Sequence, residues 1–362
     1  MVNNPSSEQI LKIAGHAAAS EGLTFLGATD LDVRQDYEKF SSWLQEGRQA
    51  GMSWMNNHIE IRQKPELLLP GAQRAFIFGF PYWLGDKWRL QSDDKAPKIA
   101  QYARISDYHR FIVAKLKNVK KKLEEISADA VGWRIAVDSA PLLERALAAA
   151  AGHGFIGKNT CFIHNQEGSF FLLGEILTTL CFDIPKTRKN NLSHMERTSM
   201  GGCGTCRRCQ VHCPTGALDS DYKIDSRKCL SYWTIENRGL IPIEFWPWVA
   251  RYLFGCDICQ LVCPYNRNIQ VAAEAKSLIR VSSTPDLIDM ATMDQDYYEK
   301  NFGGTPMTRA KKSGLRRNAL IAAVVKNDPR IWPLLTRLQD EEDPIIKGTV
   351  AQIPSFLNTK SQ

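Results

Sequence analysis

The chain has 362 residues, of which 44% are hydrophobic and 23% are charged, and its formal net charge is +7. This composition excludes a disordered chain, and the length favours two or three domains over a single core. The first residues lack the basic flank and apolar run of a signal peptide, and no stretch reaches the roughly 18 apolar residues of a membrane span. We therefore expect a cytoplasmic protein with no membrane segment. The mild positive charge allows a polyanionic partner without requiring one.

Residues 1–190 are predicted to form an α/β (α+β) domain. Apolar runs typical of strands recur at 24–29, 75–80, 133–138 and 169–177. Helical patterns lie at 107–126 and 140–152, and the second ends at Gly152, as a helix C-terminus should. This alternation indicates a sheet covered by helices. Residues 152–157, GHGFIG, have the spacing of nucleotide-binding glycines but follow a helix, so we expect no nucleotide site there.

Asp138 stands between the third apolar run and the second helical pattern. A carboxylate there lies at the carboxyl end of a strand, where open α/β folds place their sites. The alternative is that Asp138 caps the helix, and the spacing alone favours the cap. Ser139 could cap the helix equally well, which would leave Asp138 free.

Eight of the ten cysteines lie between residues 202 and 267, after a polar segment at 185–201 that looks like a linker. In a reducing compartment, clustered cysteines bind metal or act in catalysis more often than they form disulfides. The first four, at 203, 206, 209 and 213, have the spacing and following proline of ferredoxins with two [4Fe-4S] clusters, in which the fourth cysteine serves the other cluster. A second, shorter copy follows at 256, 259 and 263, and Cys229 is the natural replacement for its missing cysteine.

If each run contributes its last cysteine to the cluster of the other run, an arrangement called ligand exchange here, the spacing predicts two [4Fe-4S] clusters that together use all eight cysteines. The first would be held by Cys203, Cys206, Cys209 and Cys263, and the second by Cys213, Cys229, Cys256 and Cys259. Structural zinc is the weaker alternative, because it prefers two separated CxxC pairs. Cys161 and Cys181 have apolar neighbours in the sequence, and we predict buried, inert thiols for both.

The C-terminal part is predicted to be helical, with runs at 313–327, 328–340 and 342–353. The first two resemble one HEAT-like repeat, which must dock on the rest of the protein because a single repeat cannot bury its own apolar face. We therefore divide the chain into an α/β domain at 1–190, a ferredoxin-like module at 191–270 and a short helical HEAT-like segment at 271–362.

Several motifs together resemble the epoxyqueuosine reductase family. They are GMSWM at 51–55, IRQKP at 61–65, LLLPGAQ at 67–73, YARISDYH at 102–109, VDSAPLLERALAAAAGHGFIGKNT at 137–160, GSFFLLGEI at 168–176 and the eight-cysteine module. The resemblance covers nearly the whole chain. The combination is specific, whereas the ferredoxin part alone occurs in many redox proteins.

The resemblance implies an oxidoreductase that reduces epoxyqueuosine to queuosine at the wobble position of tRNA, the last step of queuosine biosynthesis. Electrons would pass through the two clusters to a base-off cobalamin held by the N-terminal domain. Asp138 matches the proton donor of the family, which favours catalysis over the helix cap. Burial beside the corrin would raise the pKa of this carboxyl group and keep it protonated. The cobalamin-binding positions of the family correspond to Arg62, Asp138, Arg145, Phe162, Leu173, Ser231, Cys256 and Asp257.

The implied partners are a tRNA, bound through its anticodon loop, and a low-potential electron donor that the sequence does not identify; we expect a monomer. Two basic groups are candidates for phosphate contacts, with a solvated surface as the alternative for each. They are Lys186, Arg188 and Lys189, and then Arg309, Lys311, Lys312, Arg316 and Arg317. Tyr232 and Trp233 could stack on an extruded base or equally pack beside the second cluster.

Two other functions remain open. One is a reductive dehalogenase-like oxidoreductase with the same cofactors, a class that typically carries a twin-arginine signal that is not seen here. The other is a non-catalytic electron-transfer or cobalamin-handling protein, which would need neither an acid at Asp138 nor basic groups for RNA.

Overall fold

A four-stranded sheet lies at the centre of the N-terminal half in the computed structural model, which describes residues 5–86, 96–127, 130–184 and 202–360. Its strands, in spatial order, are β1 (Thr24–Thr29), β2 (Arg74–Pro81), β7 (Phe171–Thr178) and β4 (Trp133–Ala136). These are the four apolar runs predicted as strands. Every neighbouring pair is antiparallel, so the sheet is not of the parallel kind on which the comparison with open α/β folds rested.

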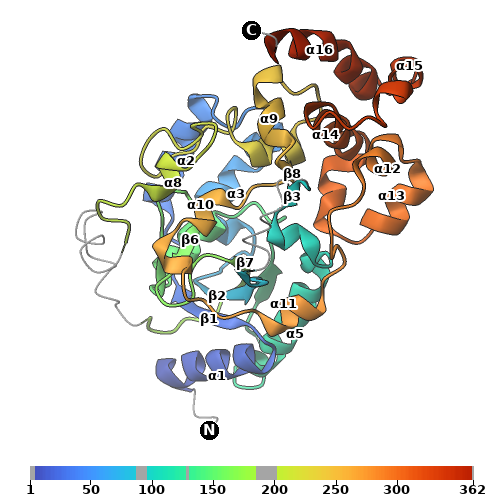
Figure 1. Cartoon of the computed structure of the whole chain (residues 1–362). Helices are drawn as coiled ribbons and strands as arrows, with labels where there is room; N and C mark the ends of the chain where they lie inside the picture. The colour runs from blue at the N-terminus through green and yellow to red at the C-terminus, as the bar shows by residue number, and fades with distance from the viewer. Residues whose placement is uncertain (1–4, 87–95, 128–129, 185–201, 361–362) are drawn as a thin grey trace.

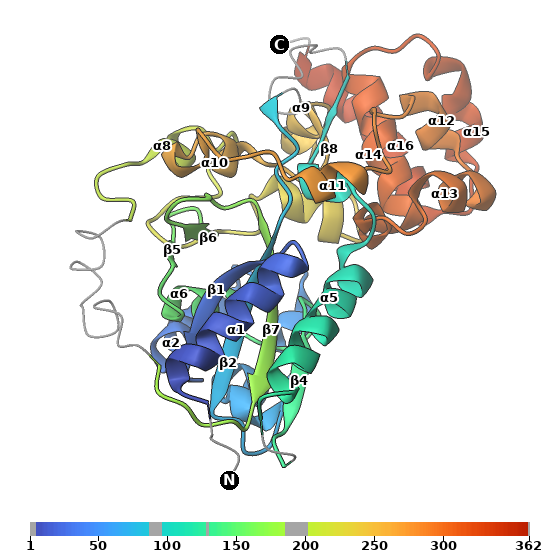
Figure 2. The same cartoon turned by 90° about the horizontal axis from the view of Figure 1, so that it is seen from below.

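Helices cover both faces of this sheet, because β2 is apolar on both sides. Phe76, Phe78 and Phe80 pack on one face against α1 (Ser7–Ser20) and α5 (Tyr108–Glu124). Ala75 and Ile77 pack on the other face against α6 (Glu144–Ala150). Figure 2 shows α1 and α5 side by side along the sheet. The prediction of a sheet covered by helices is confirmed.

The cysteine segment consists of short elements joined by loops. These are α8 (Arg208–Val211), α9 (Trp246–Val249), β8 (Tyr252–Phe254) and α10 (Ile258–Leu261). Helices α8 and α10, which carry the two cysteine repeats, lie next to each other (Figure 1). Strand β8 pairs in parallel with β3 (Lys98–Ile99), and a small hairpin of β5 (Gly154–Ile156) and β6 (Phe162–His164) extends from the N-terminal half.

The C-terminal helices pack around α14 (Lys311–Val325), whose residues from 314 to 324 are all buried. The others are α12 (Leu287–Thr292), α13 (Gln295–Phe302), α15 (Leu335–Gln339) and α16 (Pro344–Lys360), whereas α11 (Ala273–Ser277) packs with the core of the N-terminal sheet through Ala275. Helix α14 contacts α12 and α16 and also α9 and β8, so the core of this region includes part of the cysteine segment. The helical character is as predicted, while the HEAT-like comparison and the domain boundaries remain predictions. Among the described residues, no helix combines the length and the apolarity that crossing a membrane requires.

Two of the arginines predicted to contact phosphates are buried inside this core. Arg316 donates to the carbonyl of Ala291 at 2.9 Å and to Glu341 at 2.6 Å. Arg317 is fully buried and donates to the carbonyls of Trp233, Asn237 and Gly239 at 2.6–2.9 Å. Both side chains therefore join α14 to neighbouring segments, and the prediction that they contact RNA phosphates is wrong.

We predict that Arg317→Met lowers the free energy of unfolding by about 3 kcal/mol or more, because three backbone carbonyls lose the charged donor of a fully buried side chain. Urea unfolding, followed by tryptophan fluorescence, measures the change. Lys347→Met, at an exposed position on α16, is the control and should change it by less than about 0.5 kcal/mol. Equal stability of the two variants would contradict the structural role of Arg317.

Candidate functional site

A cavity of about 2560 Å³ lies between the edge of the central sheet, helix α2 (Arg34–Gln45) and the cysteine segment. The sheet edge contributes Tyr82 after β2 and Asp138 after β4. Strands β2 and β4 both end at this edge, because each pairs antiparallel with β7. The cavity is large enough for a bulky cofactor together with part of a substrate.

Helix α2 forms a wall of the cavity although none of its residues is buried. Phe40 and Trp43 line the cavity from this helix, and their rings stack with centroids 6.1 Å apart. Arg62, next to α2 in α3 (Ile59–Gln63), places its guanidinium over the Phe40 ring. A helix with a half-exposed aromatic face is suited to cover a large, partly apolar ligand.

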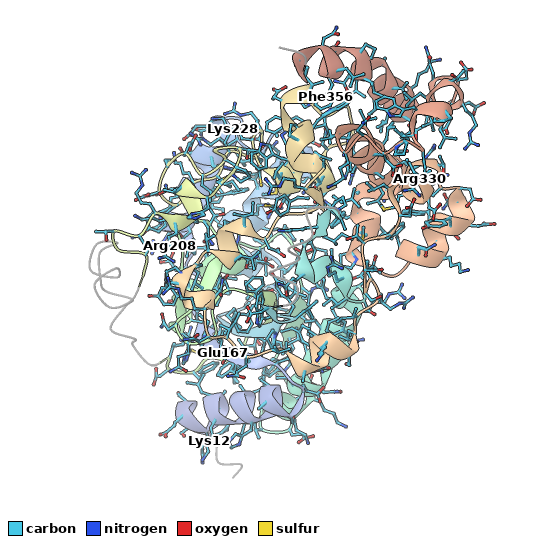
Figure 3. The ribbon with its side chains drawn as sticks, viewed as in Figure 1. Lys12, Glu167, Arg208, Lys228, Arg330 and Phe356 are labelled. Carbon is cyan, nitrogen blue, oxygen red and sulfur yellow. The ribbon has the colours of Figure 1, made fainter. Side chains whose placement is uncertain are left out.

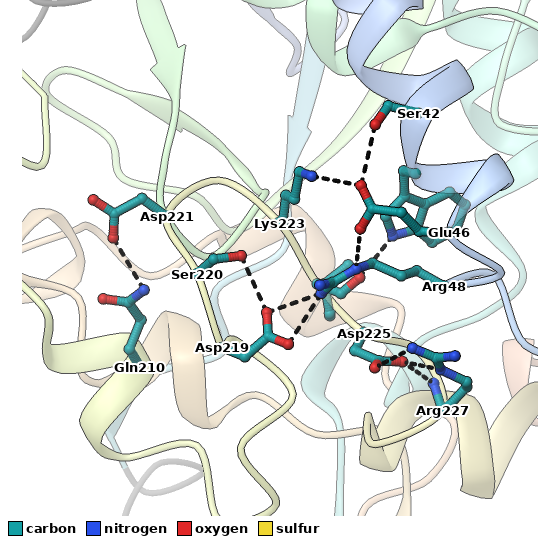
Figure 4. A network of polar contacts seen from close by, with 12 residues as sticks. Ser42, Glu46, Arg48, Gln210, Asp219, Ser220, Asp221, Lys223, Asp225 and Arg227 are labelled. Atoms are coloured by element: carbon teal, nitrogen blue, oxygen red, sulfur yellow. Dashed lines mark hydrogen bonds and ion pairs between the residues drawn. The ribbon is translucent and has the colours of Figure 1, made fainter.

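A network of ion pairs and hydrogen bonds fixes the end of α2 to the cysteine segment (Figure 4). Glu46 accepts from Lys223 at 2.7 Å and from Arg48 at 2.6 Å, and Arg48 also pairs with Asp219 at 2.9 Å. Hydrogen bonds from Lys223, then from Arg48, lower the pKa of Glu46 to about 2. The indole of Trp43 donates to the carbonyl of Ile224 at 2.6 Å. The wall of the cavity therefore keeps its position relative to the cysteines.

Several cysteines within each predicted ligand set, here called the first and the second group, are electrostatic neighbours, and the two sets remain a prediction. Cys161, which belongs to neither set, is also a neighbour of Cys259 and Cys263. Burial and the charges of Cys203, Cys263 and Cys206 raise the pKa of Cys209 to about 11, so these four thiols are neighbours. Cys256 has Cys229 and Cys213 as electrostatic neighbours, and Cys259 has Cys256 and Cys229. Among the described residues, no three side chains of His, Cys, Asp or Glu approach closely enough to hold a single metal ion. The donor set and its spacing fit two cubane clusters better than zinc.

The segment after β5 joins the N-terminal half to both cysteine groups. The backbone N–H of Lys158 donates to Cys203 Sγ at 3.3 Å, and the buried Lys158 side chain pairs with Asp221 at 3.0 Å. Asn159 Nδ2 donates to the carbonyl of Cys259 at 3.2 Å. A hydrogen-bond donor and a cation thus lie beside the first group.

The two groups differ in their relation to the cavity. Cys213, Cys229, Cys256 and Cys259 line it, whereas the thiols of the first group are not among the described residues that do so. The first group instead adjoins exposed residues of α8, such as Arg207 and Val211. Arg208 of this helix lies at the outer surface (Figure 3). The first group therefore faces the outside and the second faces the cavity.

Asp138 lies in a turn with φ of +48°, in the left-handed region that few residues other than glycine adopt. Helix α6 begins only at Glu144 and has no side-chain cap, so neither Asp138 nor Ser139 is the N-cap. The Asp138 carboxylate is left free to face the cavity. It accepts from Tyr108 Oη at 3.0 Å and from His109 Nε2 at 3.0 Å.

The pKa of Asp138 lies below its usual value, contrary to the prediction of a raised one. Burial acts to raise it, as expected, but the hydrogen bonds from His109 and Tyr108 and the charges of His109 and Arg309 outweigh burial. Glu144 differs, because burial and then the charge of Asp138 raise its pKa to about 7. Asp138 is therefore ionised at neutral pH in this arrangement.

His109 and Tyr108 contact Asp138 at the cavity, and the sequence interpretation gave neither of them a role. Both lie at the start of α5, where Asp107 caps the helix by accepting from the His109 backbone N–H at 3.0 Å. The only signal in the sequence was the YARISDYH motif at 102–109, which contains both residues. What the sequence did not indicate was the proximity of Asp138.

The predicted cobalamin positions all lie around the cavity. Arg62, Asp138, Arg145, Ser231, Cys256 and Asp257 line the large cavity. Phe162 and Leu173 line a smaller space of about 150 Å³ that also borders Asp138 and Arg145. The buried Nε of Arg62 has no hydrogen-bond partner within the part of the chain that the structure describes, and Arg145 donates to the carbonyl of Thr160 at 2.6 Å. An unpartnered cationic donor in a large cavity fits a ligand with amide and phosphate groups.

The two cysteines outside the predicted ligand sets lie elsewhere than expected. Cys181 is exposed rather than buried, and Cys161 lines the cavity beside Cys259.

The two aromatic residues after Cys229 have packing partners. Tyr232 is buried and its hydroxyl accepts from the Gly51 N–H at 3.0 Å, while Trp233 packs on Phe245. These two rings therefore pack near Cys229 and are not free to stack on a base. Arg309 and Lys311 do line the cavity. Lys186, Arg188 and Lys189 lie outside the described residues.

Comparisons with known proteins first define the class. Residues 202–266 match a family described as a 4Fe-4S double cluster binding domain, so the chain is a protein with two iron–sulfur clusters. Residues 62–139 match the family described as Epoxyqueuosine reductase QueG, DUF1730.

Whole-chain comparisons then identify the family. The epoxyqueuosine reductase of Aliivibrio fischeri is 36% identical over 88% of this chain and 83% of its own. That of Escherichia coli is 34% identical over 91% of this chain and 85% of its own. This chain belongs to the epoxyqueuosine reductase family.

Solved structures agree with this assignment. An epoxyqueuosine reductase crystallised with a tRNA-Tyr epoxyqueuosine-modified stem loop superposes with a TM-score of 0.80 at 25% identity, covering 96% of this chain and 89% of that one. The enzyme from Streptococcus thermophilus gives a TM-score of 0.78 at 28% identity, covering 96% and 90%.

We predict that Cys203→Ser removes the first cluster and about halves the iron content, because one ligand of a four-thiolate site is lost. Iron analysis and electron paramagnetic resonance of anaerobically purified protein measure this. Cys181→Ser, at the exposed thiol outside both groups, is the matched control and should retain full iron. A Cys203→Ser protein with both cluster signals would show that the ligand assignment is wrong.

Proposed function

We propose that this protein reduces epoxyqueuosine in tRNA to queuosine, using two [4Fe-4S] clusters and cobalamin. The observation that carries the proposal is the cavity of about 2560 Å³, bordered on one side by Cys213, Cys229, Cys256 and Cys259 and on another by Asp138. Electron delivery and proton delivery therefore meet in one space. Membership of the family supports the choice of substrate.

The residues around the cavity support cobalamin as the cofactor. Phe40 and Trp43 offer apolar surface, and Arg62 offers an unpartnered donor toward the polar groups of a corrin. Asp257 is buried between two cysteines of the second group, and its carboxylate accepts from the Gln101 backbone N–H at 2.8 Å. Cobalamin bound there would supply a strongly reducing cobalt centre. The protein supplies orientation, a water-restricted cavity and the protons.

The two thiol groups support a directed electron path. A low-potential donor would reduce the first cluster, which adjoins the exposed basic residues Arg207 and Arg208. The second cluster would receive the electron at the wall of the cavity. Cavity and clusters all come from one chain, which supports a monomer as the working unit. We propose the same three-part division of the chain as in the sequence analysis, with the C-terminal helices as a HEAT-like segment.

Exposed cations at the cavity support RNA as the substrate carrier. Arg309 stacks over the Trp54 ring with 4.9 Å to its centroid and pairs with Glu236 at 3.0 Å. Arg238 and Lys311 line the cavity beside it. These side chains replace Arg316 and Arg317 as candidates for contact with phosphates.

We propose that Asp138 is the catalytic residue that transfers protons to the epoxide oxygen. Its left-handed turn places the carboxyl group in the cavity, and Tyr108 Oη holds its orientation. Negative charge develops on oxygen as the epoxide opens, and a positioned acid neutralises it.

The proposed reaction is tested with anaerobically purified protein, cobalamin, a low-potential reductant and tRNA that carries epoxyqueuosine. We expect mass spectrometry of the digested nucleosides to show the loss of one oxygen atom, and only when cobalamin is present. No conversion by a protein with full iron and bound corrin would refute the proposed reaction and direct attention to halogenated substrates.

In the same assay we expect Asp138→Asn to lower turnover by about 10²-fold or more, because an amide cannot deliver an acid proton. Iron content and the corrin absorption spectrum should stay at wild-type levels, since Asn preserves the size of the side chain. Turnover close to that of the wild type would exclude Asp138 as the donor.

A further inference from the structure

Four side chains form a continuous hydrogen-bonded chain at the rim of the cavity. Asp107 Oδ1 lies 2.7 Å from His109 Nδ1, and His109 Nε2 lies 3.0 Å from Asp138 Oδ2. The same Asp138 oxygen accepts from Tyr108 Oη at 3.0 Å. Both ring nitrogens of His109 therefore face a carboxylate, an arrangement that only a doubly protonated imidazolium satisfies fully.

The charges around this chain place a proton on His109. The hydrogen bond to Asp138 raises the pKa of His109 to about 9, against burial and with help from Asp107. The other charged or titratable groups that act on the pair are Tyr108 on α5, Tyr102 in the turn before it, Glu144 at the start of α6, the buried Glu175 on β7, and Arg309 from the C-terminal region. At neutral pH His109 carries its proton, while Asp138 is a carboxylate.

The proposed reaction needs two protons. Converting an epoxide to an alkene breaks two C–O bonds, forms one C=C π bond, consumes two electrons and two protons, and releases one water molecule. The clusters account for the electrons. An ionised Asp138 holds no proton at the start, and even a protonated one would hold only half of the number required. A second proton-holding group must therefore communicate with Asp138.

Building on the proposed function, we propose that His109 is the positioning residue that loads Asp138 with protons, with Asp107 holding the imidazole in place. The Nε2 proton passes to Asp138, and Asp138 passes it to the substrate oxygen. His109 then regains a proton from water, since its side chain is 38% exposed. A second transfer along the same route supplies the second proton, and the oxygen leaves as water.

Glu144 is the competing source of protons. It lines the same cavity, it interacts electrostatically with Asp138, and its raised pKa of about 7 leaves it partly protonated near neutrality. No hydrogen bond between Glu144 and Asp138 is found among the described residues, whereas His109 contacts Asp138 directly. Geometry therefore favours His109, and the two sources predict different pH profiles.

The charge state of His109 is measured first, by a pH titration of protein labelled with ¹⁵N in its histidines, with no substrate present. We expect one histidine to titrate near pH 9, and its pKa to fall by at least about one unit in Asp107→Asn and in Asp138→Asn, because each loses a carboxylate partner. The signal is assigned by its absence in His109→Gln. A His109 that is neutral at pH 7 would overturn the inference.

The pH dependence of turnover is measured next on the holoenzyme. A group that acts in its protonated form is active below its pKa, so wild-type kcat should fall as the pH rises through about 9. Asp107→Asn should move this fall to lower pH. His109→Gln should lower kcat by about 10²-fold and abolish the fall near pH 9, with KM for tRNA unchanged. His16→Gln, at an exposed position on α1, is the control and should match the wild type.

The outcomes separate the two proposals. If the wild type converts no substrate, the proposed function fails and this inference falls with it. If the wild type converts substrate but His109→Gln keeps its kcat and its fall near pH 9, this inference alone is wrong. A wild-type kcat that falls near pH 7, with this fall lost in Glu144→Gln but kept in His109→Gln, would assign the role to Glu144 instead.

Discussion

The side chain of Asn266 joins the cysteine segment to the central sheet, and the geometry of the cavity depends on it. Asn266 is fully buried; its amide donates to Ser169 Oγ at 2.9 Å and to the Gln260 carbonyl at 2.8 Å, and it accepts from the Ser169 backbone N–H at 2.7 Å. Gly168 is left-handed, with φ of +74°, and a Cβ there would lie only 2.0 Å from Asn266 Oδ1. This explains why a glycine and a serine precede β7. Because the Asn266 amide uses both of its protons and its oxygen, the network stabilises the position of α10 relative to the sheet.

The backbone of Asp138, on another wall of the cavity, is strained, and this strain places its carboxyl group. An aspartate with φ of +48° costs free energy that a glycine would not, of order 1 kcal/mol. The turn delays the start of α6 to Glu144 and directs the Asp138 carboxyl group toward α5. There Tyr108 and His109 meet it, so the strained backbone is compensated by two hydrogen bonds. The same turn that weakens the helix start makes the carboxylate available.

Much of the fold could be read from the sequence because strand and helix periodicities are local. The direction of strand pairing could not, because β2 and β7 are buried on both faces and such runs also occur in parallel sheets. The cysteine spacing predicted a domain with two [4Fe-4S] clusters, because short loops between thiols are a local feature of the sequence; which cysteines share a cluster remains a prediction. The prediction of phosphate contacts failed for Arg316 and Arg317. Arginine side chains are mostly exposed, and the backbone carbonyls that these two bind lie far away in the sequence. The contact of His109 with Asp138 joins segments 29 residues apart and left no local signal.

The placement of the second cysteine group on one wall of the cavity and of Asp138 on another suits the proposed reaction. An electron that reaches the cavity raises its negative charge, and each added charge increases the proton affinity of nearby acids. Proton uptake and electron arrival are therefore coupled by electrostatics even without direct contact between the walls. An ionised Asp138 paired with a protonated His109 is neutral as a unit, and it carries one negative charge after it releases a proton, as a lone carboxyl group would. The pair differs in that His109, whose side chain is 38% exposed, can take up a proton from water and restore the neutral pair. The ion pair thus suits a reaction in which two protons must follow two electrons into the same cavity.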